Sequence, residues 1–178
     1  MSANDDQFNS LMLPHMAAAY NLARWLTGNP DDASDVVQES YLRAIKFFSS
    51  YRGGAARAWL LTIVRNTSLN WLVQKRNQRT VPLNADDAEE GHQDIIDDKV
   101  DLEFDLIQKE AAATMDQLIQ ALPVAYREVV ILREIEELSY KEIAEVIGMP
   151  IGTVMSRLAR ARKALQGQWQ KNPEGRGV

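Results

Sequence analysis

The sequence predicts an all-α protein built from two small helical domains that an acidic linker joins. Both halves carry apolar residues at the three- and four-residue spacing of an α-helix, with capping residues, Gly or Pro between these stretches and a segment of different composition between the halves. With 46% hydrophobic residues among 178, the chain can form two small cores. We expect domains at 1–80 and 108–171, the linker at 81–107 and a frayed tail at 172–178.

The first domain is expected to begin with two helices that meet at a Gly-Asn turn. The first covers about residues 5–27, with Pro14 as a bend or break, and its apolar residues are Phe8, Leu11, Met12, Ala19, Leu22 and Leu26. Gly28 ends it, and Asn29 caps a second helix that runs to about Phe48. The inward stripe of this second helix is predicted to be Val37, Tyr41, Ala44, Ile45 and Phe48. The outward face, with Gln38 at its edge, is predicted to be Asp35, Glu39, Leu42 and Lys46.

A third helix is expected from Ala55 or Ala56 to about Arg76. Its predicted core side consists of Trp59, Leu60, Ile63, Val64, Leu69 and Leu72, and its polar side of Arg57, Arg65, Asn66, Asn70, Lys75 and Arg76. The aromatic residues Tyr51, Trp59 and Trp71 lie among these charges. Cations for phosphates and flat rings for unstacked bases suit single-stranded nucleic acid. The alternative is that these aromatic residues only form core.

The distribution of charge favours a nucleic-acid partner, although the chain as a whole has a net charge of −5. Residues 81–108 hold ten acidic residues against one lysine, a local charge of −9, so the remaining chain carries +4. Residues 40–79 hold eight basic residues and no acidic one. Partners meet local charge, and the average therefore misleads.

The second domain is expected to contain two helices followed by a helix-turn-helix. The first two run from about 106 to 121, where Leu122-Pro123 closes the helix, and from 125 to 136. In the helix-turn-helix, Ser139 and Glu142 have the spacing of a capping box at the start of a short helix. Gly148 and Pro150 break that helix.

The last helix, from Ile151, has an apolar and a basic side. Val154, Leu158, Ala161 and Leu165 share the apolar side, whereas Ser156, Ala159, Arg160 and Lys163 lie opposite, flanked by Arg157 and Arg162. A helix that packs by one side and offers arginines, small residues and a hydroxyl on the other suits the DNA major groove. The alternative is an ordinary helical hairpin whose charges are only solvated.

Composition argues against several other classes of protein. Without cysteine, the chain has no disulfides or thiolate metal ligands, and the only histidines, His15 and His92, lie in separate segments. We find no phosphate-binding loop, metal-spaced cluster or nucleophile set, so we expect neither an enzyme nor a cofactor or metal site. The acidic start is unlike a secretory signal and no run is long enough to span a bilayer, so we expect a cytoplasmic protein without membrane insertion.

Several short motifs together resemble one family. They are Asp35-Val36-Val37-Gln38-Glu39, Tyr51-Arg52-Gly53, Trp59-Leu60, Arg65-Asn66, Leu122-Pro123, Leu132-Arg133, Leu138-Ser139-Tyr140, Gly152-Thr153-Val154 and Ser156-Arg157. In order and spacing they resemble extracytoplasmic-function (ECF, group 4) sigma factors of bacterial RNA polymerase, over nearly the whole length. The resemblance implies a region 2 domain, a region 4 domain, and a chain that directs core polymerase to specific promoters, assists promoter melting and often serves stress responses.

The resemblance also implies the contacts of each region. Polymerase, through its β′ clamp helices and with the β subunit as a further partner, would meet Asp35, Gln38, Glu39 and Leu42. The minus-ten element would meet Tyr51, Arg52, Arg57, Asn66 and Asn70. The minus-thirty-five element would meet Thr153, Met155, Ser156, Arg157, Ala159, Arg160 and Lys163. Family analogy also implies a separate anti-sigma factor.

This chain departs from the family pattern in two places. Met155 and Ala159 are weak hydrogen-bonding readers, which leaves Arg160, Ser156 and DNA shape to carry upstream specificity. The segment between Tyr51 and Trp59 is one residue shorter than the common pattern.

Promoter geometry predicts that polymerase spreads the two domains. Elements about 25 base pairs apart lie roughly 85 Å apart, whereas the linker as a free coil averages about 30 Å. Because the first half is expected to bind polymerase and melted strand and the second half intact duplex, we also expect two halves that do not share a core. The rival interpretation is a helix-turn-helix regulator that binds promoters without core polymerase and senses a ligand through its first half.

Overall fold

The computed structural model describes residues 3–80 and 114–171, and all regular structure in these two ranges is helical. The all-α prediction is therefore confirmed for the described residues. The predicted linker and tail, His92 and the start of the helix expected from 106 lie outside them. Within the two ranges, no helix combines the length and the apolar character that crossing a membrane requires.

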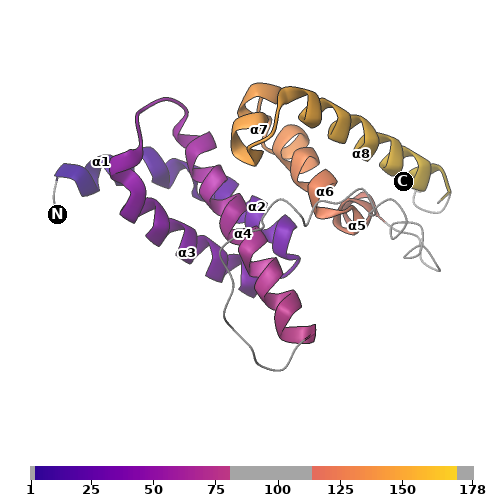
Figure 1. Ribbon diagram of the computed structural model, residues 1–178, viewed down its shortest axis with the longest axis horizontal. Coiled ribbons are helices and arrows are strands. Elements are labelled where there is room, and N and C mark those ends of the chain that lie inside the picture. The colour runs from indigo at the N-terminus through magenta and orange to yellow at the C-terminus, as the bar shows by residue number, and fades with distance from the viewer. Residues whose placement is uncertain (1–2, 81–113, 172–178) are drawn as a thin grey trace.

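The N-terminal half consists of four α-helices and two short 3-10 turns (Figure 1). Their bounds are α1 Ala3–Met12, η1 Leu13–His15, α2 Met16–Thr27, α3 Pro30–Phe47, η2 Phe48–Ser50 and α4 Ala56–Thr80. The expected break at Pro14 is confirmed, because Pro14 lies in the 3-10 turn between α1 and α2. Helix α4 extends four residues beyond the predicted end at Arg76.

The turn between α2 and α3 has the predicted chemistry. Gly28 ends α2 in the left-handed conformation, at φ 75°. The side chain of Asn29 accepts hydrogen bonds from the amides of Asp31 and Asp32, and Pro30 occupies the first turn of α3. These bonds satisfy amides that the helix itself leaves unpaired, which fixes where α3 begins.

The core of the N-terminal half largely follows the predicted stripes. Phe8, Met12, Leu22 and Leu26 are buried, and the Tyr41 hydroxyl donates to the Met12 carbonyl at 2.9 Å, tying α3 to the end of α1. The prediction for Ile45 is wrong, because its side chain is 53% exposed. The buried positions of α3 are Ala33, Val36, Val37, Ser40 and Ala44. Ile45 lies beside this buried stripe in the last turn of the helix and is not part of it.

The C-terminal half forms a smaller bundle. Its bounds are α5 Met115–Ala121, α6 Val124–Val130, a π-helical turn η4 Ile131–Ile135, α7 Tyr140–Ile147 and α8 Ile151–Lys171. Both bonds of the Ser139–Glu142 capping box are present, and Gly148 ends α7 at φ 67°. Val154, Leu158 and Ala161 of α8 are buried and Leu165 is partly buried, so the predicted helix-turn-helix is confirmed.

The two halves pack against each other, with α2 contacting α6 and η4 and α4 contacting α7 (Figure 1). Buried residues of both halves form one continuous hydrophobic cluster. The expectation that the halves share no core is therefore wrong for this conformation. Sequence periodicity identifies which face of a helix is apolar, but it does not identify which other helix covers that face.

We expect the replacement of Ser139 by Ala to lower the free energy of unfolding by about 1 kcal/mol, because the substitution leaves a first-turn amide of α7 without its acceptor. Urea denaturation followed by circular dichroism measures this change. Ser139→Asp retains a capping oxygen and should remain close to the parent protein. An equal loss in both variants would contradict the role of the cap.

Candidate polymerase and nucleic-acid interfaces

The outward face of α3 presents the four residues expected to meet polymerase. Asp35, Gln38, Glu39 and Leu42 are all exposed, and Leu42 is 69% exposed. Glu39 accepts from the Arg43 guanidinium at 2.5 Å, an exposed pair one turn apart. The predicted orientation of this face is confirmed. Its contact with polymerase stays a prediction.

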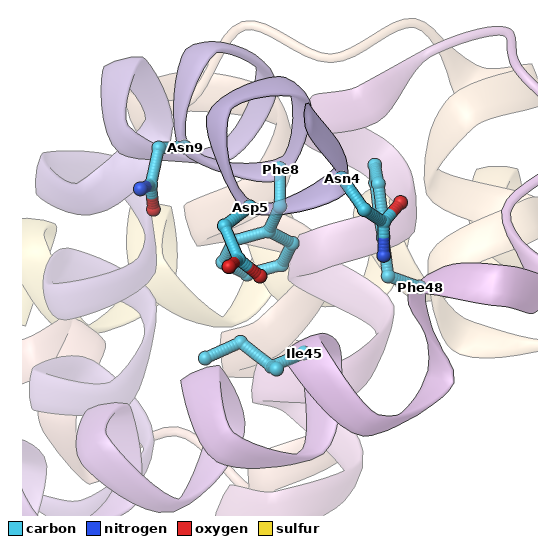
Figure 2. Close-up of a pocket in the computed structure, with 6 residues that line it drawn as sticks. All are labelled: Asn4, Asp5, Phe8, Asn9, Ile45 and Phe48. Carbon is cyan, nitrogen blue, oxygen red and sulfur yellow. The ribbon is translucent and has the colours of Figure 1, made fainter. Parts of the chain in front are cut away.

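A shallow hollow of about 240 Å³ lies beside this face, between α1 and the end of α3. Figure 2 shows Asp5 and Phe8 of α1 on one side and Ile45 on the other, with Asn4, Asn9 and Phe48 completing the lining. The exposed side chain of Ile45 is thus part of a wall rather than of the core. The periodicity of α3 alone could not show this, because the wall exists only where α1 crosses.

The loop before α4 holds Tyr51 against an aromatic cluster. The Tyr51 ring stacks on Phe48 with centroids 5.8 Å apart and lies 5.3 Å from the Trp59 ring. Its hydroxyl donates to the Gly54 carbonyl at 2.8 Å, across a turn in which Gly53 and Gly54 have positive φ. The ring is half-buried and Arg52 beside it is exposed. The loop therefore presents an ordered aromatic edge next to a cation.

The two tryptophans of α4 contribute to the core more than to the surface. Trp59 and Trp71 are both partly buried and pack against the hydrophobic cluster. The indole N–H of Trp71 is buried without a hydrogen-bond partner among the described residues. The interpretation of these two residues as core is therefore the better one, which leaves Tyr51 as the aromatic residue placed for stacking.

The polar residues of α4 are divided between solvent and the C-terminal half. Asn66 is exposed, Asn70 is half-buried, and Lys75 pairs with Asp32 at 2.8 Å within the same half. Arg65, in contrast, is only 9% exposed, so the prediction that it lies on the outer basic side is wrong. The reason is a buried carboxylate contributed by the other half of the chain.

Glu128 of α6 is that carboxylate, and its exposure is zero. It accepts two hydrogen bonds from Arg65, at 2.8 and 3.1 Å, and lies 3.5 Å from Arg157 of α8. A buried carboxylate needs such partners, because an unpaired charge in the interior is strongly unfavourable. One signal for it is present in the sequence, since Glu128 is three residues from both Ala125 and Ile131 and so lies on the apolar side of its helix.

A second contact of the same kind joins α4 to the end of η4. Arg57 donates to Glu136 at 2.5 Å, and the Glu136 side chain is 5% exposed. Arg57, expected at the minus-ten element, is thus engaged by the C-terminal half in this conformation. Neither Glu128 nor Glu136 was among the predicted site residues.

Arg127 fastens the C-terminal half to the end of α2. Its guanidinium donates to the carbonyls of Trp25 and Leu26 at 3.0 and 3.4 Å, and to that of Leu122 at 2.9 Å. The last carbonyls of a helix are the negative end of its dipole, which favours a cation there. Burial lowers the pKa of Arg127 to about 10, so the group remains charged at neutral pH.

The predicted outer face of α8 is exposed with one exception, and its contact with DNA stays a prediction. Met155, Ser156, Ala159, Arg160 and Lys163 are exposed and Thr153 is half-exposed. The Ser156 hydroxyl donates to the Thr153 carbonyl at 3.1 Å, which orients it at the start of the helix. Arg157 is the exception, because its side chain is 11% exposed and turns inward to Glu128. The prediction that it faces DNA is not met here.

Arg162, at the edge of this face, also has an intramolecular partner. It donates to Glu134 at 2.5 and 3.1 Å, an exposed pair within the C-terminal half. The hydrogen bond with Glu134 raises the pKa of Arg162 above its ordinary value.

Among residues 3–80 and 114–171, no group of His, Cys, Asp or Glu is arranged to hold a metal ion.

Comparison with known families agrees with this architecture. The family description Sigma-70 region 2 matches residues 11–78, and Sigma-70, region 4 matches residues 112–165. The chain belongs to the sigma-70 family and is an RNA polymerase sigma factor of the ECF type. The class is therefore non-enzymatic, and the interpretation as a regulator without polymerase is not favoured.

Individual relatives cover most of the chain. The RNA polymerase sigma-H factor of Pseudomonas aeruginosa is 36% identical, over 89% of this chain and 83% of the relative. The ECF RNA polymerase sigma-E factor of Haemophilus influenzae is also 36% identical, over 84% and 79%. The solved sigma factor RpoE of Bartonella quintana, in complex with the anti-sigma factor NepR, has a TM-score of 0.68 at 24% identity, over 92% and 97%. This last likeness is one of fold.

We expect Arg127→Met to lower the free energy of unfolding by about 1.5–3 kcal/mol, because it removes a charged donor from three backbone carbonyls while keeping an apolar stem of similar length. Thermal and urea denaturation measure the loss. The matched control is Arg79→Met at the exposed end of α4. Equal stability of the two variants would show that the contact with α2 contributes nothing.

Proposed function

We propose that this sigma factor directs core RNA polymerase to two-element promoters through three separate faces. The outward face of α3 binds the β′ clamp helices, the Tyr51 loop with the polar side of α4 holds the melted minus-ten strand, and the outer face of α8 reads the minus-thirty-five duplex. The β subunit is a further polymerase contact.

The exposed face of α3 is the observation that carries the polymerase contact. Leu42 is 69% exposed among charged and polar neighbours, one turn from the exposed Glu39. A large apolar side chain in that setting is better explained by a protein partner than by water. The surrounding carboxylates suit a basic counterpart and set its orientation.

For the minus-ten strand, the supporting geometry is the ordered Tyr51 edge beside Arg52. Asn66 is exposed on α4, and Asn70, half-buried, lies one turn further along. An aromatic edge can stack on an unpaired base while arginine and asparagine contact phosphate or base edges.

Regulation and location belong to the same proposal. An anti-sigma factor controls this chain by covering one or more of the three faces, and the chain acts in the cytoplasm, where the polymerase is. The supporting fact for control by a separate protein is the solved relative described with an anti-sigma factor.

The direct test is reconstitution of transcription. Core polymerase with the purified chain should start transcription from specific promoters selected out of genomic DNA, whereas core alone should not. A chain that fails to bind core would refute the proposal. Promoter binding by the chain alone, equal to that with core, would favour the regulator.

We expect Glu39→Arg to weaken binding to core polymerase at least about tenfold, because it reverses one charge at the centre of the α3 face. Titration of labelled chain with core measures the affinity, and circular dichroism checks the fold. Arg43→Glu is a second charge-reversal variant of the same face, since Arg43 is the ion-pair partner of Glu39 on α3. If both variants bind core normally, this face is not the contact.

We expect Arg160→Ala to weaken recognition of the upstream element by about 1–3 kcal/mol while sparing scrambled DNA. Lys163→Ala should instead weaken binding to all sequences alike, as the loss of a phosphate contact does. Competition binding by the holoenzyme with matched and scrambled promoters separates the two. Uniform loss with Arg160→Ala would reduce that residue to a phosphate contact.

A further inference from the structure

Two ion pairs join α4 to the C-terminal half with matching spacing. Arg65 bonds Glu128 at 2.8 Å and Arg57 bonds Glu136 at 2.5 Å. The two arginines are eight residues apart in the chain, and so are the two glutamates, in reversed order. Helix α4 and the α6–η4 segment therefore run in opposite directions, with two connections between them. We refer to these connections as the interdomain ion pairs.

The π-helical turn η4 helps to bring both glutamates to one side. In an α-helix, which turns about 100° per residue, eight residues would leave Glu136 about 80° round the axis from Glu128. The turn at Ile131–Ile135 lies between them and is wider, so it turns less per residue and reduces that offset. A π turn at this point is consistent with a functional constraint on the segment.

Burial makes the interdomain ion pairs more than surface contacts. Glu128 has no exposure and Glu136 is 4% exposed. When the halves separate, Glu128 keeps Arg157 of its own half, and Glu136 passes into water. Arg57 and Arg65 are then freed together, on the helix proposed to face the melted strand. Arg57 and Arg65 therefore hold the halves together in the closed chain and become available when the halves separate.

Carboxylates and phosphates compete for the same guanidinium donors. We infer that Glu128 and Glu136 occupy, in the closed chain, the two arginines of α4 that bind the phosphates of the single-stranded promoter, so the chain excludes that strand until its halves separate. This inference rests on the proposed function, which places α4 at the minus-ten element. Promoter spacing points the same way, because the two elements lie roughly 85 Å apart and cannot both be met by a closed chain.

The test measures closure and strand binding on the same full-length chain without polymerase. The chain has no cysteine, so Gln78→Cys and Gln166→Cys, both at exposed positions of α4 and α8, accept a donor and an acceptor dye. The variant Glu128→Gln/Glu136→Gln should lower energy transfer between the dyes. It should also bind a labelled single-stranded DNA of mixed sequence about tenfold more tightly, since apparent affinity scales with the open fraction.

A matched control separates release of the arginines from loss of negative charge. Glu134→Gln/Glu145→Gln removes two carboxylates from the same half, and Glu134 also has an arginine partner, but that partner, Arg162, lies within the half. This control should leave energy transfer unchanged and raise DNA affinity by less than about twofold. An equal rise in both double variants would overturn the inference.

A second variant keeps the test decisive if Glu128→Gln fails to fold. Glu136→Gln alone breaks the pair whose arginine is already 38% exposed, and should lower energy transfer to a smaller extent. The exchange Arg57→Glu/Glu136→Arg restores opposite charges and should restore transfer. Unchanged transfer in Glu136→Gln, or opening without tighter DNA binding, would contradict the inference.

A different measurement, transcription with core polymerase, tests the proposed function separately from this inference. A parent chain that does not support transcription with core polymerase would refute the proposed function, whatever the dyes report. A parent chain that transcribes, but whose variants neither open nor gain DNA affinity, would refute only this inference.

Discussion

The burial of Glu128 is the constraint on which the arrangement of the two halves depends. A carboxylate without solvent contact requires cations, and it has one from each half, Arg65 of α4 and Arg157 of α8. The conformation thus joins a helix of region 2 to the last helix of region 4 through one acidic side chain. Arg127 and the Arg57–Glu136 pair add to the same contact.

The contact between the halves leaves the three proposed faces exposed to different extents. The proposed polymerase face of α3 and most of the outer face of α8 stay exposed, whereas Arg57 of α4 is bonded to the C-terminal half. If the proposed polymerase contact holds, a closed chain can therefore still be recognised by polymerase through Leu42 and its neighbours. In the inference drawn above, binding of the melted strand is the step that needs separation, in agreement with the need to spread the two regions along a promoter.

Local rules predicted the elements well because each rests on few neighbours. The Asn29 cap, the Ser139–Glu142 capping box and the glycine ends at Gly28 and Gly148 all form within a few residues, so sequence spacing suffices. The errors concern residues whose partners are distant. Ile45 lines a hollow whose opposite side is formed by α1, and Arg65 and Arg157 turn inward to Glu128.

The sequence by itself determined the helices, their apolar faces, the exposed α3 and α8 surfaces and, through its ordered motifs, the family. Only the tertiary structure decided that the halves share a hydrophobic cluster and that two arginines of α4 meet two buried glutamates. The physical reason is the distance along the chain between the residues that interact. Caps and periodicity depend on contacts a few residues apart, whereas the pairing of Arg65 with Glu128 joins positions 63 residues apart and exists only when both helices are in place.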